Sequence, residues 1–133
     1  MRAMIPAIPV PGHMPPRLVE AALALHDNRL GEAEPLLKGY LKADPFDVRA
    51  IRMLAELAGR IGRYKDAETL LRRALELAPG FGAARGNLAI VLYRLNRPTE
   101  AIAELDRLMG DEPDHLGHAN LKAAAVAGSG RIS

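Results

Sequence analysis

Apolar residues recur along the chain with helical spacing, in pairs of short segments. In residues 48–62, Ile51 is followed three, four and seven positions later by Leu54, Ala55 and Ala58, which places them on one face of a helix. Residues 63–79 repeat the spacing with Ala67, Leu70, Leu71, Ala74 and Leu75. The pattern predicts two helices joined by a short turn at Gly62.

This pair of helices occurs three times, with a period of 34 residues. Four columns of identical residues share the period: Pro45, Pro79 and Pro113; Ala33, Ala67 and Ala101; Leu37, Leu71 and Leu105; Ala21, Ala55 and Ala89. Each alanine of a first helix is expected to face an alanine of the second, so that the backbones approach closely. A fixed period of this length predicts stacked helix pairs.

The residues between the helices fit this interpretation. Asn28, Gly62 and Asn96 occupy equivalent positions, and both residue types tolerate the left-handed backbone of a tight turn after a helix. Pro98 can begin a helix, because its missing N–H is not needed there. Asp47 can cap the helix that starts after it.

On these columns the chain resembles the tetratricopeptide repeat (TPR) family, over residues 14–115 and into a fourth unit. The resemblance implies an all-α, right-handed α-α superhelix of about three and a half helix-turn-helix units, about seven helices. The expected units are 14–47, 48–81, 82–115 and a partial 116–133. The sequence departs from the family at its early aromatic column, where it has Arg17, Ile51 and Arg85, and at a late small-residue column, where it has Tyr40, Ala74 and Leu108.

A narrower resemblance is to the N-terminal repeats of bacterial TPR-sulfotransferases. Three strings carry it: "DPFDVRAIRMLAELAGRIGRYKDAETLLRRALELAPGF", "NLAIVLYRLNRPTEAIAEL" and "NLKAAA". In that family a catalytic domain that uses phosphoadenosine phosphosulfate follows the repeats. The resemblance implies a catalytic domain beyond Ser133.

The two ends differ from the repeats. Residues 1–14 are proline-rich and are expected to be an extended or disordered tail ahead of a TPR domain at 15–127. Residues 128–133 read "GSGRIS", and Gly130 follows Gly62 by two periods. This ending is interpreted as the truncated turn of a fourth repeat.

Composition narrows the possible functions. The chain has 133 residues, no cysteine and a net charge of +2, which exclude a disulfide scaffold and thiol chemistry and give no indication of nucleic-acid binding. No apolar run approaches the ~18 residues of a membrane span, so a membrane is not expected as a partner. A nucleic acid is not expected either, because the net charge is small. No nucleotide-binding or catalytic motif is present. We therefore expect a cytoplasmic chain that is not itself an enzyme and has no cofactor.

One weak metal cluster can be identified. His115 and His118 lie three residues apart, after Asp111, Glu112 and Asp114. An acidic loop that caps a helix N-terminus explains the same residues. The second interpretation is favoured, and no metal is predicted.

The stripe of polar residues on the first helices is the best candidate for a binding surface. Because first helices line the concave side of such superhelices, we predict a mildly basic groove for an acidic peptide or a carboxylate. Its candidate residues are Arg49, Arg52, Glu56, Arg60, Asn87, Tyr93, Arg94 and Asn120, with Gly86 and Ile90 on the same stripe. The alternative is that the arginines pair with Glu56 and serve only solubility.

These features favour a protein-interaction scaffold that binds a peptide or a partner domain, as the N-terminal part of a larger protein. A stand-alone enzyme is disfavoured, because no catalytic set is present. A third possibility is self-association, because residues 116–127 are apolar on nearly all sides and need cover. The candidate residues for such homo-oligomers are Leu116, Ala119, Ala123 and Val126.

Overall fold

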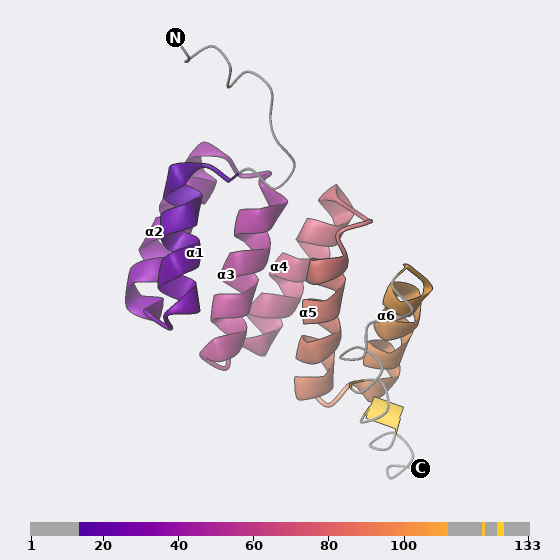
Figure 1. Cartoon of the computed structure of the whole chain (residues 1–133). Coiled ribbons are helices and arrows are strands. Elements are labelled where there is room, and N and C mark those ends of the chain that lie inside the picture. Colours follow the sequence, from indigo (N-terminus) through magenta and orange to yellow (C-terminus); the bar gives the residue numbers. More distant parts are fainter. Residues whose placement is uncertain (1–13, 112–120, 122–124, 127–133) are drawn as a thin grey trace.

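The computed structural model describes residues 14–111, 121 and 125–126. Six helices lie within residues 14–111: α1 (Pro16–His26), α2 (Leu30–Ala43), α3 (Val48–Arg60), α4 (Tyr64–Leu77), α5 (Gly82–Arg94) and α6 (Pro98–Asp111). They form three helical hairpins stacked side by side in chain order (Figure 1). The first helices, α1, α3 and α5, contact one another in succession and form one layer. This part of the chain contains no strand, and the all-α stack of helix pairs predicted from the period is confirmed (Figure 1).

Each hairpin turns through one residue in the left-handed region, as the sequence predicted. Asn28, Gly62 and Asn96 have φ angles of 60°, 83° and 61°. After the first turn residue, the Arg29 N–H donates to the Ala24 carbonyl at 2.8 Å, and the other two turns repeat this bond one and two periods later. The bonds satisfy carbonyls that the helix ends leave open.

Two predicted helix starts are also confirmed. Pro98 is the first residue of α6. The Asp47 side chain accepts a hydrogen bond from the Arg49 N–H at 3.0 Å, which caps α3. The same carboxylate accepts from the Tyr40 hydroxyl at 2.7 Å, so the tyrosine in the small-residue column connects α2 to the start of α3.

The alanine columns lie in the core. All six alanines are almost completely inaccessible to solvent: Ala21, Ala33, Ala55, Ala67, Ala89 and Ala101. Leu37, Leu71 and Leu105 are buried around them. Small residues at these contacts let paired helices pack closely, as expected.

Helix α3 packs on two sides, where the sequence analysis expected one apolar face. Ile51 and Ala55 belong to the apolar cluster shared with α4 and α5, whereas Met53 and Leu57 pack against α1 and α2. Leu54 is only half-buried. A middle helix of a stack has neighbours before and after it, so a single stripe cannot describe its buried surface.

Among the residues that the structure describes, two glutamates are buried, which the sequence analysis did not foresee. Glu68 and Glu104 are 8% and 7% exposed. Glu104 pairs with Arg85 at 2.7 Å and with Arg107 at 3.2 Å. Glu68 pairs with Arg97 at 2.8 Å and with Arg72 at 2.9 Å. Buried carboxylates need such partners, because an unpaired charge is costly in the interior.

Several predictions fall on residues outside the described set. These are the tail, the histidine pair, Asn120, most of the predicted seventh helix and the final turn. Residues 121, 125 and 126 are helical; Ala125 is buried and Val126 is 49% exposed. Among the helices that the structure describes, none has the length and apolar character needed to span a membrane.

Candidate functional site

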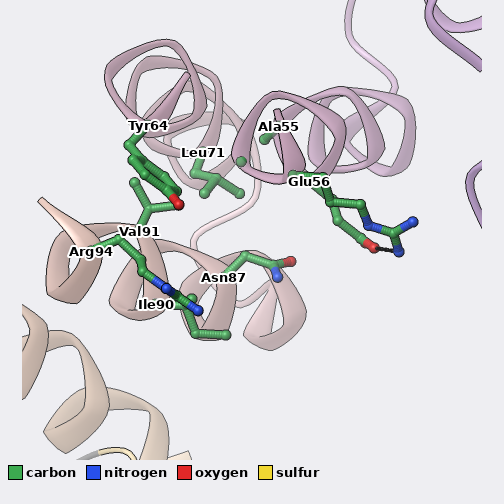
Figure 2. Close-up of a pocket in the computed structure, with 10 residues that line it drawn as sticks. Ala55, Glu56, Tyr64, Leu71, Asn87, Ile90, Val91 and Arg94 are labelled. Carbon is green, nitrogen blue, oxygen red and sulfur yellow. Dashed lines mark hydrogen bonds and ion pairs between the residues drawn. The ribbon is translucent and has the colours of Figure 1, made fainter. Parts of the chain in front are cut away.

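A hollow of about 470 Å³ opens between α3, α4 and α5 (Figure 2). We call it the α3–α5 hollow. Its lining comprises Ala55, Glu56, Gly59, Arg60, Tyr64, Leu71, Asn87, Ile90, Val91 and Arg94. Four predicted groove residues are therefore brought together: Glu56, Arg60, Asn87 and Arg94.

The deeper wall of the hollow is apolar. Ala55, Leu71 and Val91 are buried residues of three different helices, and Tyr64 stands half-buried at the start of α4. Figure 2 shows Tyr64 and Leu71 on one side and Val91 with Ile90 on the other. Ile90 is 44% exposed, although it lines the hollow. The site thus offers apolar surface that is open to a ligand.

Two arginines of α3 share one carboxylate at the edge of this wall. Glu56 accepts from the Arg52 guanidinium at 3.4 Å and from that of Arg60. Arg60 also donates to the Leu25 carbonyl at 2.5 Å, and Arg52 donates to the Asn87 side-chain oxygen at 3.2 Å. The sequence analysis gave pairing of the arginines with Glu56 as the alternative to a binding groove. These two arginines do have this partner within the protein.

Arg94 differs from these two arginines. It is exposed on the last turn of α5, and among the described residues its guanidinium has no hydrogen-bond or ion-pair partner. Figure 2 shows its side chain running along α5 beside Ile90. Arg60 and Arg94 line the hollow together with the carboxylate of Glu56, and Arg52 lies beside Glu56. Among the described residues, positive charge therefore exceeds negative charge around the hollow.

Other candidates of the predicted groove lie outside the hollow. Arg49 pairs with Asp47 at 2.9 Å, at the start of α3. Burial would raise the pKa of Asp47, but hydrogen bonds from Arg49 and Tyr40 outweigh it and lower that pKa. Tyr93 is exposed and does not line the hollow, and Gly86 is buried.

The sequence analysis missed Tyr64. It begins the second helix of its unit, where the other units have Leu30 and Pro98. A single aromatic in a column that otherwise lacks one was the available signal. The column alone could not show that its ring reaches a space between α3 and α5.

The part of the chain that the structure describes holds no candidate metal centre. No group of three or more histidine, aspartate or glutamate side chains there could hold a metal ion. The weak candidates His115 and His118 fall outside that part.

Comparison with known proteins finds a similarity to one family model and to one curated relative. Residues 60–125 match the family model described as a tetratricopeptide repeat. The human protein O-mannosyl-transferase TMTC3 is 28% identical over 85 residues, which are 64% of this chain. The chain spans only 9% of that relative's length.

Solved structures share the fold. An O-GlcNAc transferase mutant of Thermobaculum terrenum is 28% identical with a TM-score of 0.79, over 83% of this chain and 21% of that one. YrrB, described as a TPR protein with an unusual peptide-binding site, is 21% identical with a TM-score of 0.77, over 88% and 60%. The first TPR of Spaghetti (RPAP3), bound to the HSP90 peptide SRMEEVD, is 18% identical with a TM-score of 0.79, over 84% and 90%. At such low identities, the last two show the fold alone. The chain is therefore similar to tetratricopeptide repeat proteins over residues 60–125 in sequence, and its fold is that of the solved structures.

Proposed function

We propose that this chain is a non-catalytic interaction scaffold that holds an acidic peptide segment in the α3–α5 hollow. The observation that carries the proposal is an open hollow with apolar walls and an excess of positive charge. Burial of apolar surface supplies affinity, and charged groups at the rim fix orientation and partner choice. Two structural neighbours, YrrB and Spaghetti, are themselves described with a peptide site or a bound peptide.

Binding of labelled peptides tests this proposal. An acidic nonapeptide should bind more tightly than its lysine-substituted counterpart, and its affinity should fall as salt rises, because salt screens the rim charges. Fluorescence anisotropy measures both effects.

The variant Asn87→Asp tests whether the acidic peptide binds at the hollow. The new carboxylate lies within reach of Arg52 and removes part of the positive excess, so we expect the acidic peptide to bind about tenfold more weakly. Ala103→Asp adds the same charge at an exposed position of α6 and should leave binding unchanged. Equal loss in both variants, or equal affinity for the lysine peptide, would overturn the proposal.

A second proposal concerns the protein context. The matched relative and the Thermobaculum structure are named transferases of which this chain spans 9% and 21%. These similarities support the proposal that the chain is the TPR region of a larger enzyme. The more specific candidate for that enzyme is a sulfotransferase. A reading frame that continues beyond Ser133 into a nucleotide-binding domain is the expected result, and a stop codon there contradicts it. A cytoplasmic location of the protein stays a prediction.

Self-association is the remaining candidate. Val126 exposes about half of its surface beside the buried Ala125. Exposed apolar side chains at the end of a stack favour a second copy as cover. Light scattering should show an average mass that rises with protein concentration. The variant Val126→Glu should have a lower average mass at the same concentration. A strict monomer at high concentration would contradict the idea.

A further inference from the structure

We propose that the α3–α5 hollow selects a peptide in which an apolar side chain lies next to a carboxylate. The apolar side chain enters the hollow beside Tyr64 and Ile90, over the buried Leu71 and Val91, and the carboxylate binds the Arg94 guanidinium. The inference rests on the proposed function and adds the chemistry of the partner.

The apolar half follows from the walls. Three helices contribute apolar surface to one open space of about 470 Å³, within the range of ligand sites. Charged side chains occupy the edge at Glu56 and Arg60, whereas the wall formed by α4 is apolar apart from the Tyr64 hydroxyl. A wholly polar peptide would leave this wall uncovered, so an apolar side chain is the better occupant.

The carboxylate half follows from which cations already have partners. Arg52 and Arg60 are engaged by Glu56, and each has a further bond to Asn87 or to the Leu25 carbonyl. Arg94 lines the same hollow with no such partner among the described residues. A guanidinium can take a carboxylate through two parallel hydrogen bonds, which makes it the anchor for an acid beside the apolar side chain.

The apolar wall and the Arg94 guanidinium lie close enough together to bind one short peptide segment. Val91 and Arg94 are three residues apart on α5 and line the same hollow. Residues at that spacing are neighbours on a helix surface. The geometry therefore fits an apolar residue and an acid that are adjacent in the peptide.

Three labelled nonapeptides test the selection. They share acidic flanks and differ at the centre, which reads Leu-Glu, Ala-Glu or Leu-Gln. We expect the Leu-Glu peptide to bind the wild-type protein roughly tenfold more tightly than either of the others, because each of the others lacks one of the two groups.

Gly59→Leu tests the apolar half from the protein side. Gly59 lines the hollow from α3, and a Cβ added there meets nothing within 4 Å, so a leucine side chain can start into the space of the hollow without strain at its first carbon. Leucine also has the higher helix propensity. The variant should bind the Leu-Glu peptide no better than the Ala-Glu peptide, with unchanged helical circular dichroism. Gly39→Leu makes the same change on α2 in equally open space, away from the hollow, and should bind as wild type.

Arg94→Gln tests the carboxylate half. It should remove the preference for Leu-Glu over Leu-Gln and keep the preference for leucine over alanine. Arg17→Gln removes an exposed arginine of α1 that does not line the hollow and should change neither preference.

The outcomes separate this inference from the proposed function. If an acidic peptide binds but leucine and alanine are equivalent, or if Gly59→Leu binds as wild type, the inference is wrong and the scaffold proposal stands. Retained discrimination against Leu-Gln in Arg94→Gln also overturns it. If none of the three peptides binds the wild-type protein, both proposals fail.

Discussion

The ion pair between Arg85 and Glu104 occupies positions that are apolar in the preceding repeat. One period earlier, the equivalent residues are Ile51 and Leu70, which pack in the same apolar cluster. In the third repeat the two side chains are 14% and 9% exposed and lie 2.7 Å apart. The departure from the family's aromatic column at Arg85 is thus compensated by a partner 19 residues later.

Exchange of this pair tests the compensation. Arg85→Ile alone leaves the Glu104 carboxylate without its closest partner and should lower the free energy of unfolding by about 3 kcal/mol. The double variant Arg85→Ile with Glu104→Leu restores the apolar pair of the second repeat and should be as stable as wild type or more so. Urea denaturation measures both, and a double variant less stable than the single one would contradict this explanation.

Some features of single residues could be predicted from the sequence and others could not. The left-handed turns were predictable, because asparagine and glycine reveal a backbone preference directly. That Arg94 has no partner among the described residues was not predictable, because it depends on Glu56 lying between Arg52 and Arg60 on another helix. The polar stripe predicted four residues of the hollow, and the pairing that distinguishes them needed the three-dimensional structure.

At the scale of the helices, the network around Glu68 connects neighbouring hairpins. Glu68 lies on α4, whereas Arg97 comes directly before α6 and Glu100 lies in its first turn. Burial would raise the pKa of Glu68, but hydrogen bonds from Arg97 and Arg72 outweigh it and lower that pKa. Glu100 and Glu68 in turn raise the pKa of Arg97. The carboxylates of the network are therefore bound more strongly in their charged form.

This shift gives stability a defined pH dependence. A carboxyl whose folded pKa lies below its ordinary value of 4.5 contributes stability above that value and loses it as pH falls through the folded pKa. Glu68→Gln should therefore cost about 2 kcal/mol at neutral pH and reduce the decline in stability between about pH 5 and pH 2.

Urea denaturation across this pH range measures the effect. Glu76→Gln, at an exposed glutamate of the same helix, is the matched control and should follow wild type. A Glu68→Gln variant whose acid decline equals that of wild type would show that the network does not couple to protons in this way.

The helices themselves were largely predictable, since the alanine, leucine and proline columns define two helices in each period. Their buried faces were less so. The pattern in α3 suggested one face, but Met53 and Leu57 pack against the hairpin before it. Buried glutamates could not be predicted either, because Glu68 finds its partner Arg97 29 positions later.

For the whole molecule, stacking connects fold to function. Helix α3 contributes to both apolar clusters and contacts α1 and α5 in the layer of first helices. That layer carries Glu56, Arg60, Asn87 and Arg94 on adjacent helices. Each repeat alone would present half of the hollow, so the binding site is a property of two neighbouring units.

The central claim is that a peptide binds across these two units. Nuclear magnetic resonance of the labelled protein, titrated with the Leu-Glu peptide, tests it most directly. The account predicts that amide shift changes gather at Gly59, Tyr64, Asn87 and Arg94, around the α3–α5 hollow. Shift changes confined to the outer faces of α2, α4 and α6, or none at saturating peptide, would contradict it.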